Sequence, residues 1–243
     1  PFDLLSAKFL IKNSDIIKIA SSDNNFFPLL DIVLKSNKKI IISTGMTNYK
    51  EISYLIKYIK NKIGIKKVKE RISFLHCVTS YPAKDRYINL NSIPYLIKKT
   101  RLTIGYSDHS LGFEACLAAV SLGAKIIEKH FTLNKKFSKF RDHAISADIN
   151  DLKLIVGSIR KIENQLGKPS KNITTEEKKY VKLLRRAPYS NRDIKKGEKI
   201  SYTNVNFLRE TNSNNFLNLK DIIGKKIKKN LKKNMIISKN HLL

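Results

Sequence analysis

The chain contains five short apolar runs, each ending in polar residues and followed by a stretch whose apolar residues have helical spacing. Short apolar runs predict strands buried on both faces, and the stretches between them predict helices. This alternation is typical of a parallel α/β sheet. The predicted strands are 16–20, 39–44, 72–77, 102–107 and 125–131, and the predicted helices are 1–15, 24–35, one from about 48, 91–99, 112–122 and 148–166.

The composition changes after the last predicted helix. The sequence becomes polar, and from Arg185 short strand-like pieces alternate with turns. We therefore expect three parts: 1–168 as part of a barrel-type synthase domain, 169–185 as a linker, and 186–243 as a small β or mixed domain. The chain begins at Pro1 without a Met, and five strands cannot close an eight-stranded barrel. On the barrel interpretation we expect a fragment that lacks three N-terminal strands.

The formal net charge is +28 and the pI is about 10.0. Because a strongly positive net charge is typical of proteins that bind nucleic acids, nucleic-acid binding is a remote alternative function. The lysines are scattered, however, and neither an aromatic-interleaved RNA-binding pattern nor a zinc-finger pattern accompanies them. We expect a solvated basic surface that also attracts small anions.

Two further absences bound the location of the protein. No run of 18 or more apolar residues is present, so we expect no membrane span. Cys77 and Cys116 lie far apart in apolar surroundings without a CxxC spacing, which favours reduced thiols and a cytoplasmic protein.

Two histidines lie at or just beyond the carboxyl ends of neighbouring predicted strands. His109 follows one strand and His130 ends the next. Parallel strands lie about 5 Å apart, so both imidazoles can reach one ion, for which Mn²⁺ or a related divalent cation is suited. The alternative is two unrelated polar histidines.

Other strand ends carry residues able to bind an anion. Lys18 lies inside an apolar run with Ser21 at its end, and Ser107 ends another strand. Together they can hold a phosphate, although Lys18 can equally reach solvent at the strand end. Glu128 either orients a ligand by accepting a hydrogen bond from it or pairs with a neighbouring lysine.

Two loop residues are candidates for binding a sugar. Asp142 lies after the last strand, on a loop expected to overhang the barrel mouth, and either binds a sugar hydroxyl or is solvated. Tyr81 either stacks on a sugar or packs against its own loop.

Three linked motifs resemble a known family. Leu75-His76-Cys77-Val78-Thr79-Ser80-Tyr81-Pro82, Gly105-Tyr106-Ser107-Asp108-His109-Ser110-Leu111-Gly112 and the segment from Leu122 to Leu133 are similar to N-acetylneuraminate (sialic acid) synthases. The likeness continues through Arg185-Arg186 and Asp193–Glu198 into the C-terminal antifreeze-like (SAF) domain, so that it covers essentially the whole chain.

The resemblance implies a partial (β/α)8 TIM barrel with about five of its eight strands, followed by the SAF domain. It implies an enzyme that condenses phosphoenolpyruvate with an N-acetylhexosamine and water to give a nine-carbon 2-keto-3-deoxy acid and phosphate. It also implies Mn²⁺, with Mg²⁺ or Co²⁺ as substitutes, and a domain-swapped homodimer. By residue, it implies a metal site at His109 and His130; phosphoenolpyruvate contacts from Lys18, Ser21, Thr79 and Ser107; and sugar contacts from Asp23, Tyr81, Asp142 and Arg209.

Departures from the family pattern concern the sugar. Arg209 is followed by Glu210-Thr211-Asn212 where the family has Arg-Pro-Gly, and Phe140-Arg141-Asp142-His143 replaces Gly-Pro-Asp-His. Legionaminic and pseudaminic acid synthases, which use other aldoses, are therefore the nearest alternatives. A truncated, inactive chain is a third interpretation, since an acid/base glutamate that the family carries near its first strand would lie outside this sequence.

Overall fold

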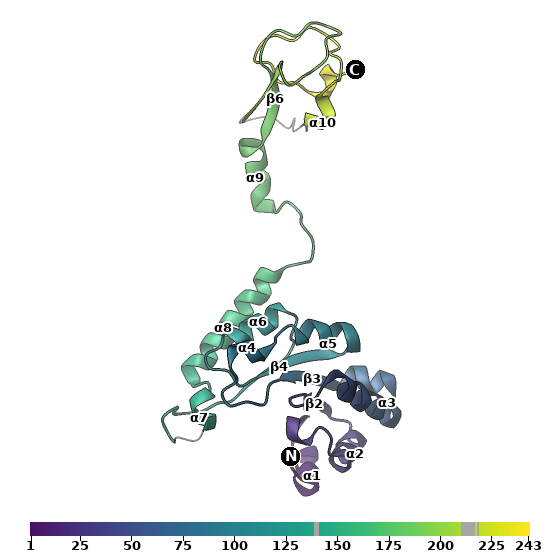
Figure 1. Cartoon of the computed structure of the whole chain (residues 1–243), viewed down its shortest axis with the longest axis vertical. Coiled ribbons are helices and arrows are strands. Elements are labelled where there is room, and N and C mark those ends of the chain that lie inside the picture. Colours follow the sequence, from purple (N-terminus) through teal and green to yellow (C-terminus); the bar gives the residue numbers. More distant parts are fainter. Residues whose placement is uncertain (139–140, 210–216, 218) are drawn as a thin grey trace. The chain divides into compact units, whose positions relative to one another are not determined.

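The computed structural model describes residues 1–138, 141–209, 217 and 219–243. The chain divides into two compact units, Pro1–Lys168 and Pro169–Leu243, each described by itself (Figure 1). The predicted small domain and its linker fall in the second unit. Phe140 and Glu210-Thr211-Asn212, on which the departures from the family pattern fell, lie outside the described residues.

The first unit is built on a curved sheet of five parallel strands, which lie side by side in chain order. This confirms the predicted parallel α/β sheet. The fifth strand is shorter than the predicted 125–131, because only three of its residues pair with the fourth strand. The strands are β1 (Ile16–Ile19), β2 (Lys39–Ser43), β3 (Ile72–Cys77), β4 (Thr103–Asp108) and β5 (Ile127–Lys129).

Helices follow the strands as the apolar spacing predicts. α3 begins at a capping box in which Asn48 and Glu51 each bind the other's backbone N–H, and α8 begins at the same motif formed by Asp148 and Asp151. The chain leaves helical geometry inside α3 at Gly64, where φ is +79°. The predicted helices are α1 (Leu4–Asn13), α2 (Phe27–Lys35), α3 (Tyr49–Arg71), α5 (Ser92–Thr100), α6 (Glu114–Ser121) and α8 (Ile149–Leu166).

Short helical segments that the periodicity does not predict lie beyond the carboxyl ends of the strands. They are η1 (Ser21–Asp23), α4 (Asp85–Ile88) and α7 (Arg141–Ile145). Asp142, expected on a loop, therefore lies in the first turn of α7. One turn of helix is too short for an apolar repeat, so the sequence pattern could not show it.

The core of the first unit lies between the sheet and its helices. Alternate residues of the strands point to this side, because side chains along a strand face opposite sides in turn. They are fully or almost fully buried: Ile17, Ile19, Ile40, Ile42, Phe74, Ile104 and Tyr106.

The second unit pairs β6 (Arg186–Ser190) with β7 (Val205–Arg209) in an antiparallel ladder. The segment expected to be a linker, 169–185, contains helix α9 (Thr175–Leu184), which begins at a Thr174–Glu177 capping box. Two short segments complete the unit, α10 (Leu219–Ile222) and η2 (Lys239–His241). Its own core consists of Ile194, Ile200, Val205, Leu217, Ile222, Ile227, Leu231 and Ile237.

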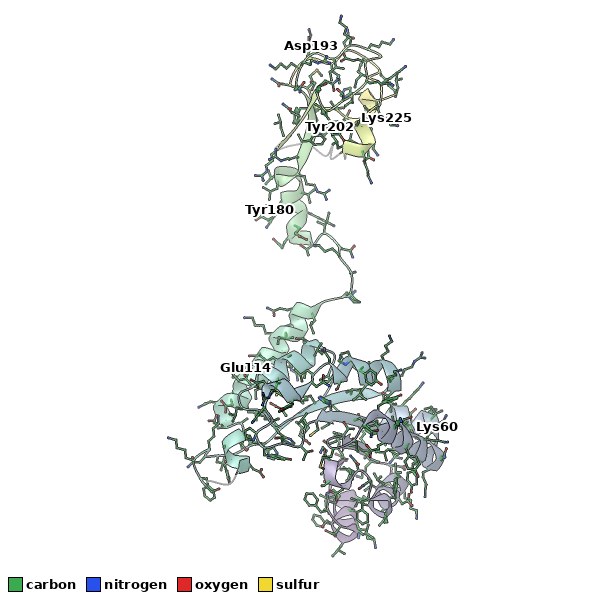
Figure 2. All side chains as sticks on the ribbon, in the orientation of Figure 1. Lys60, Glu114, Tyr180, Asp193, Tyr202 and Lys225 are labelled. Carbon is green, nitrogen blue, oxygen red and sulfur yellow. The ribbon has the colours of Figure 1, made fainter. Side chains whose placement is uncertain are left out.

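Lysine side chains project from both units, as Lys60 on α3 and Lys225 illustrate (Figure 2). Both are exposed, in keeping with a solvated basic surface. Within the described residues, every helix is too short or too polar to cross a membrane.

Candidate active site at the carboxyl ends of the strands

A cavity of about 340 Å³ opens at the carboxyl ends of the strands. All five strands or the segments directly after them contribute to its wall, which explains why residues far apart in sequence meet there. The ends of parallel strands are the usual position of an active site in (β/α) folds. The cavity is lined by Lys18, Ala20, Ser21, Ser22, Ser43, Met46, Cys77, Thr79, Tyr81, Ser107, His109, Glu128 and His130.

His109 and His130 face each other across one side of the cavity. Their ring centroids lie 5.2 Å apart, close enough for one cation to contact a nitrogen of each. The ring of Tyr81 packs on His109 at a centroid distance of 4.2 Å, tilted by 33°, and meets His130 edge-on at 5.8 Å. The tyrosine therefore packs on both imidazoles and closes that side of the cavity.

The hydrogen bond of His109 fixes its tautomer. Its Nδ1 lies 2.8 Å from the carbonyl oxygen of Val78, which can only accept, so Nδ1 carries a proton, and in the neutral ring the lone pair is on Nε2. A histidine that binds a metal through one ring nitrogen commonly donates a hydrogen bond from the N–H of the other to a carbonyl in this way.

The surroundings of His130 favour its neutral, ligand-competent form. Burial lowers its pKa and the neighbouring His109 lowers it further, while Asp142 and Glu128 act in the opposite direction. The two imidazoles fit a divalent cation. In the part of the chain that the structure describes, no cluster of three or more His, Cys, Asp or Glu side chains could hold a metal, so water or substrate oxygens would complete the coordination.

Glu128 connects two of the candidate anion-binding residues. Its carboxylate lies 3.3 Å from Lys18 Nζ and accepts a 2.6 Å hydrogen bond from Ser107 Oγ. The interpretation of Glu128 as the partner of a lysine is thus the one the structure shows. Both charged side chains remain about one third exposed, so this ion pair is weak enough to rearrange around an incoming anion.

Ser21 and Thr79 approach each other around Gly45. Gly45 N–H donates to Ser21 Oγ at 2.9 Å, and a side-chain carbon at Gly45 would lie only 2.2 Å from Thr79 Oγ1. Glycine is therefore required here because no other residue lets the two hydroxyls come so close to the backbone.

Ser43 is a candidate that the sequence analysis did not single out. It is 2 % exposed and lines the cavity from the end of β2. Among the described residues its hydroxyl is the buried side-chain oxygen without a hydrogen-bond partner. A buried hydroxyl in this state is costly unless a ligand satisfies it. Its position as the last residue of a strand was the available signal.

Two of the expected residues of the first unit do not line the cavity. Asp23 lies in η1 and accepts a hydrogen bond from Ser22 Oγ at 2.7 Å. Asp142 lies in α7, near enough to His130 to act on its pKa. Arg209 ends β7 in the second unit, where it is exposed and pairs in register with Arg186.

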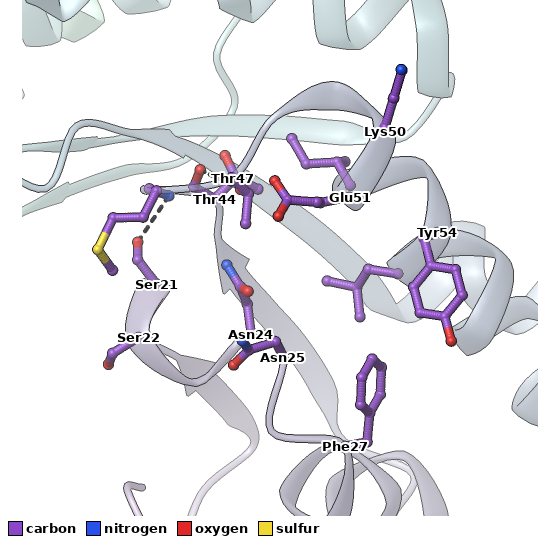
Figure 3. A pocket seen from close by; sticks show the side chains of 14 residues that line it. Ser21, Ser22, Asn24, Asn25, Phe27, Thr44, Thr47, Lys50, Glu51 and Tyr54 are labelled. Atoms are coloured by element: carbon purple, nitrogen blue, oxygen red, sulfur yellow. Dashed lines mark hydrogen bonds between the residues drawn. The ribbon is translucent and has the colours of Figure 1, made fainter.

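A larger cavity of about 610 Å³ adjoins the first and shares Ser21, Ser22 and Met46 with it (Figure 3). It lies between α2 and α3, with Phe27 and Tyr54 in edge-on contact at one side. No histidine lines it. The smaller cavity is the candidate active site, because of these two it is the one lined by His109, His130 and Lys18.

The fold and this cavity define an α/β protein whose candidate active site lies at the carboxyl ends of parallel strands. Residues 1–171 match the model of the NeuB family, and the chain belongs to that family. Its relatives include enzymes named as synthases of three related sugar acids.

The chain is 38% identical over 238 residues to the N,N'-diacetyllegionaminic acid synthase of Campylobacter jejuni, covering 98% of this chain and 70% of that protein. It is 32% identical over 232 to 233 residues to the pseudaminic acid synthases of that species, covering 95% to 96% of this chain and 66% of each. The crystal structure of the N-acetylneuraminic acid synthetase of Leptospira borgpetersenii in complex with citrate matches with a TM-score of 0.67 and 35% identity, over 74% of this chain and 61% of that one.

Proposed function

We propose that the protein is a nonulosonic acid synthase, which condenses phosphoenolpyruvate with an N-acylated aldose and water to form a nine-carbon 2-keto-3-deoxy acid and phosphate. Family membership and the named activities of the relatives support this class of reaction. The observation that carries it is one cavity holding both a facing pair of imidazoles and a lysine surrounded by hydroxyls.

The lysine end of the cavity would hold phosphoenolpyruvate. Lys18 supplies a positive charge, and the hydroxyls of Ser21, Ser43 and Thr79 supply hydrogen bonds to phosphate or carboxylate oxygens. The partnerless hydroxyl of Ser43 would gain its acceptor on binding. Fixing the phosphate end would aim C3 of phosphoenolpyruvate at the other side of the cavity, where the sugar aldehyde is expected.

The imidazole end would hold a divalent cation, for which we propose Mn²⁺. When bound by His109 and His130, the cation supplies a Lewis acid that polarises the aldehyde oxygen of the open-chain sugar. His109 is oriented for this role by the hydrogen bond from Nδ1 to the Val78 carbonyl, which makes Nε2 the ligating nitrogen of the neutral ring. Tyr81 covers both rings and excludes water from that side.

Which aldose is used follows from contacts outside the cavity wall. We propose Asp142 as a sugar contact, since it lies near His130, and we keep Asp23 as a second candidate. The higher identity to the legionaminic acid synthase favours its aldose as the second candidate substrate beside N-acetylmannosamine.

The test is a substrate profile of the whole protein with phosphoenolpyruvate, Mn²⁺ and the aldose precursors of sialic, legionaminic and pseudaminic acid. Phosphate release and the mass of the sugar acid are measured together. We expect one precursor to give a product whose mass equals that of the aldose plus pyruvic acid, the part of phosphoenolpyruvate that remains after phosphate is released. Phosphate release without a condensed product would contradict the proposal.

We also propose that the second unit is a SAF-type domain whose exposed Arg209 reaches the cavity of a partner subunit in a swapped homodimer. Mixing inactive His109→Ala and Arg209→Ala proteins tests this. In a swapped dimer, subunits that exchange form one intact site and recover up to about a quarter of the activity of the native protein, because one site in four combines two unaltered parts. Absence of recovery after demonstrated subunit exchange would contradict the swap.

A further inference from the structure

The two histidines are preceded in the sequence by a second pair of interacting residues, on the opposite face of the sheet. Asp108 comes directly before His109, and Lys129 comes directly before His130. Asp108 and Lys129 are direct neighbours in the register of β4 and β5. Side chains alternate along a strand, so this pair lies on the sheet face opposite the histidines. A contact between the two residues therefore holds β4 and β5 together at the point where each strand leads into its histidine.

This contact is a buried ion pair. Lys129 Nζ lies 2.8 Å from Asp108 Oδ2, and the two side chains are 6% and 0% exposed. Burial acts to raise the pKa of Asp108, but the hydrogen bonds from Lys129 and Ser110 outweigh it and lower that pKa below its ordinary value. Each member of the pair therefore relies on the other for its ionic contact.

The same pair fixes the backbone on both sides of His109. Asp108 Oδ1 accepts hydrogen bonds from Ser110 N–H at 2.8 Å and Ser110 Oγ at 2.7 Å, and Lys129 Nζ also donates to the Ser110 carbonyl at 2.6 Å. His109 thus lies between two residues that are both bound to Lys129. The position of one histidine is linked to the residue that precedes the other.

Other positions on this face do not use ionic contacts. Apart from His76↔Tyr106, the neighbouring register pairs are Ile17↔Ile40, Ile19↔Ile42, Ile40↔Ile72, Ile42↔Phe74, Phe74↔Ile104 and Tyr106↔Ile127. A buried ion pair is seldom more stabilising than apolar residues of similar size, but it demands a defined geometry. An ionic contact at the one position that adjoins both histidines therefore indicates a requirement for geometry.

We infer that Asp108 and Lys129 are positioning residues, which set the distance between the imidazoles of His109 and His130 and thereby the affinity for a divalent cation. This inference rests on the proposed cation site. Neither residue lines the cavity, so neither would touch the cation or the substrates.

The experiment measures Mn²⁺ affinity of the whole protein by the EPR signal of free Mn²⁺, together with thermal unfolding. Lys129→Met leaves a buried carboxylate without its partner and should lower both unfolding temperature and affinity. Asp108→Asn combined with Lys129→Met removes both charges and keeps an oxygen for Ser110. In this double variant we expect the unfolding temperature to recover largely, while the affinity for Mn²⁺ stays at least about tenfold weaker than in the native protein.

Val33→Ala is the matched control, because Val33 is fully buried in α2, and α2 contributes no residue to the contacts of Asp108 and Lys129. It should lower the unfolding temperature and leave Mn²⁺ affinity unchanged. Native affinity in the double variant, or an equal loss of affinity in Val33→Ala, would overturn the inference while leaving the proposed function intact. Native protein that binds no Mn²⁺ would overturn both.

Discussion

The two faces of the same five strands have opposite characters. On the face toward the helices, the register pairs are almost all Ile, Phe and Tyr, and they are buried. On the other face, the residues near the carboxyl ends are Lys18, Ser43, Ser107, Glu128 and His130, and they line the cavity. Because successive side chains alternate between these faces, one residue of a strand packs in the core and the next lines the candidate active site. Substitutions on the cavity face should therefore lower activity, and substitutions on the helix face should lower stability.

The largest expected effect is on the cavity face. His109→Ala should remove one cation ligand and lower synthase activity by more than about 100-fold. Even the mutation of a residue that only hydrogen-bonds to a metal ligand typically lowers metal affinity or activity about 10- to 100-fold. The unfolding temperature should change little. Activity at saturating Mn²⁺ and a thermal melt measure the two properties separately. Turnover at the native level would contradict the assignment.

On the helix face, Ile42→Ala should instead destabilise the fold. Ile42 is 0% exposed, and removing such a side chain costs about 2–5 kcal/mol of the free energy of unfolding, including the cavity left behind. Urea denaturation measures this loss. At temperatures where the variant stays folded, its KM for phosphoenolpyruvate should equal the native value. A strong rise in KM without a loss of stability would show that the faces are not separate.

Lys18→Met should weaken phosphoenolpyruvate binding on the cavity face. Losing one charge of a bound ion pair costs at least about 2 kcal/mol, which corresponds to a roughly 30-fold rise in KM. The KM for the sugar should change less. Lys62→Met, which removes the surface partner of Asp31, is the matched control and should leave both constants unchanged. Equal rises for both substrates would place Lys18 outside the anion site.

Ser43→Ala tests the partnerless hydroxyl with a smaller expected effect. A hydrogen bond to a charged group contributes about 1.5–3 kcal/mol, so KM for phosphoenolpyruvate should rise about tenfold or more. The native hydroxyl is buried without a partner, so the free variant should be at least as stable as the native protein. A loss of stability in the absence of ligand would contradict this account.

The smallest effect concerns pH. Burial lowers the pKa of His76 below its ordinary value of 6.5. As the pH falls below 6.5, the unfolded chain binds a proton that folded His76 does not yet accept, so stability present above this pH is lost as it falls. His76→Gln should make the unfolding temperature less dependent on pH between about 5 and 7. An unchanged slope would show that His76 does not contribute.

The sequence predicted the sheet well for a physical reason. Strands such as 39–44 and 72–77 are buried and apolar, and this property is visible in any short window. The proximity of His109 and His130 could also be predicted, because they end adjacent strands. What these residues do remains a proposal.

Other features could not be predicted from local patterns. Helix α9 is largely polar, so its composition predicts a linker, and its Thr174–Glu177 cap was the local signal for a helix. The contact of Asp108 with Lys129 depends on register between two strands, and a single lysine next to a strand end carries no such information. The partnerless state of Ser43 is a property of its surroundings in three dimensions.

The central claim is that His109 and His130 bind one cation together. Anomalous diffraction from a crystal of the whole protein soaked in Mn²⁺, recorded near the manganese absorption edge, tests it most directly. The account predicts one peak in this cavity, within bonding distance of His109 Nε2 and of one ring nitrogen of His130. Manganese found only at other positions, or bound to one of these rings without the other, would contradict it.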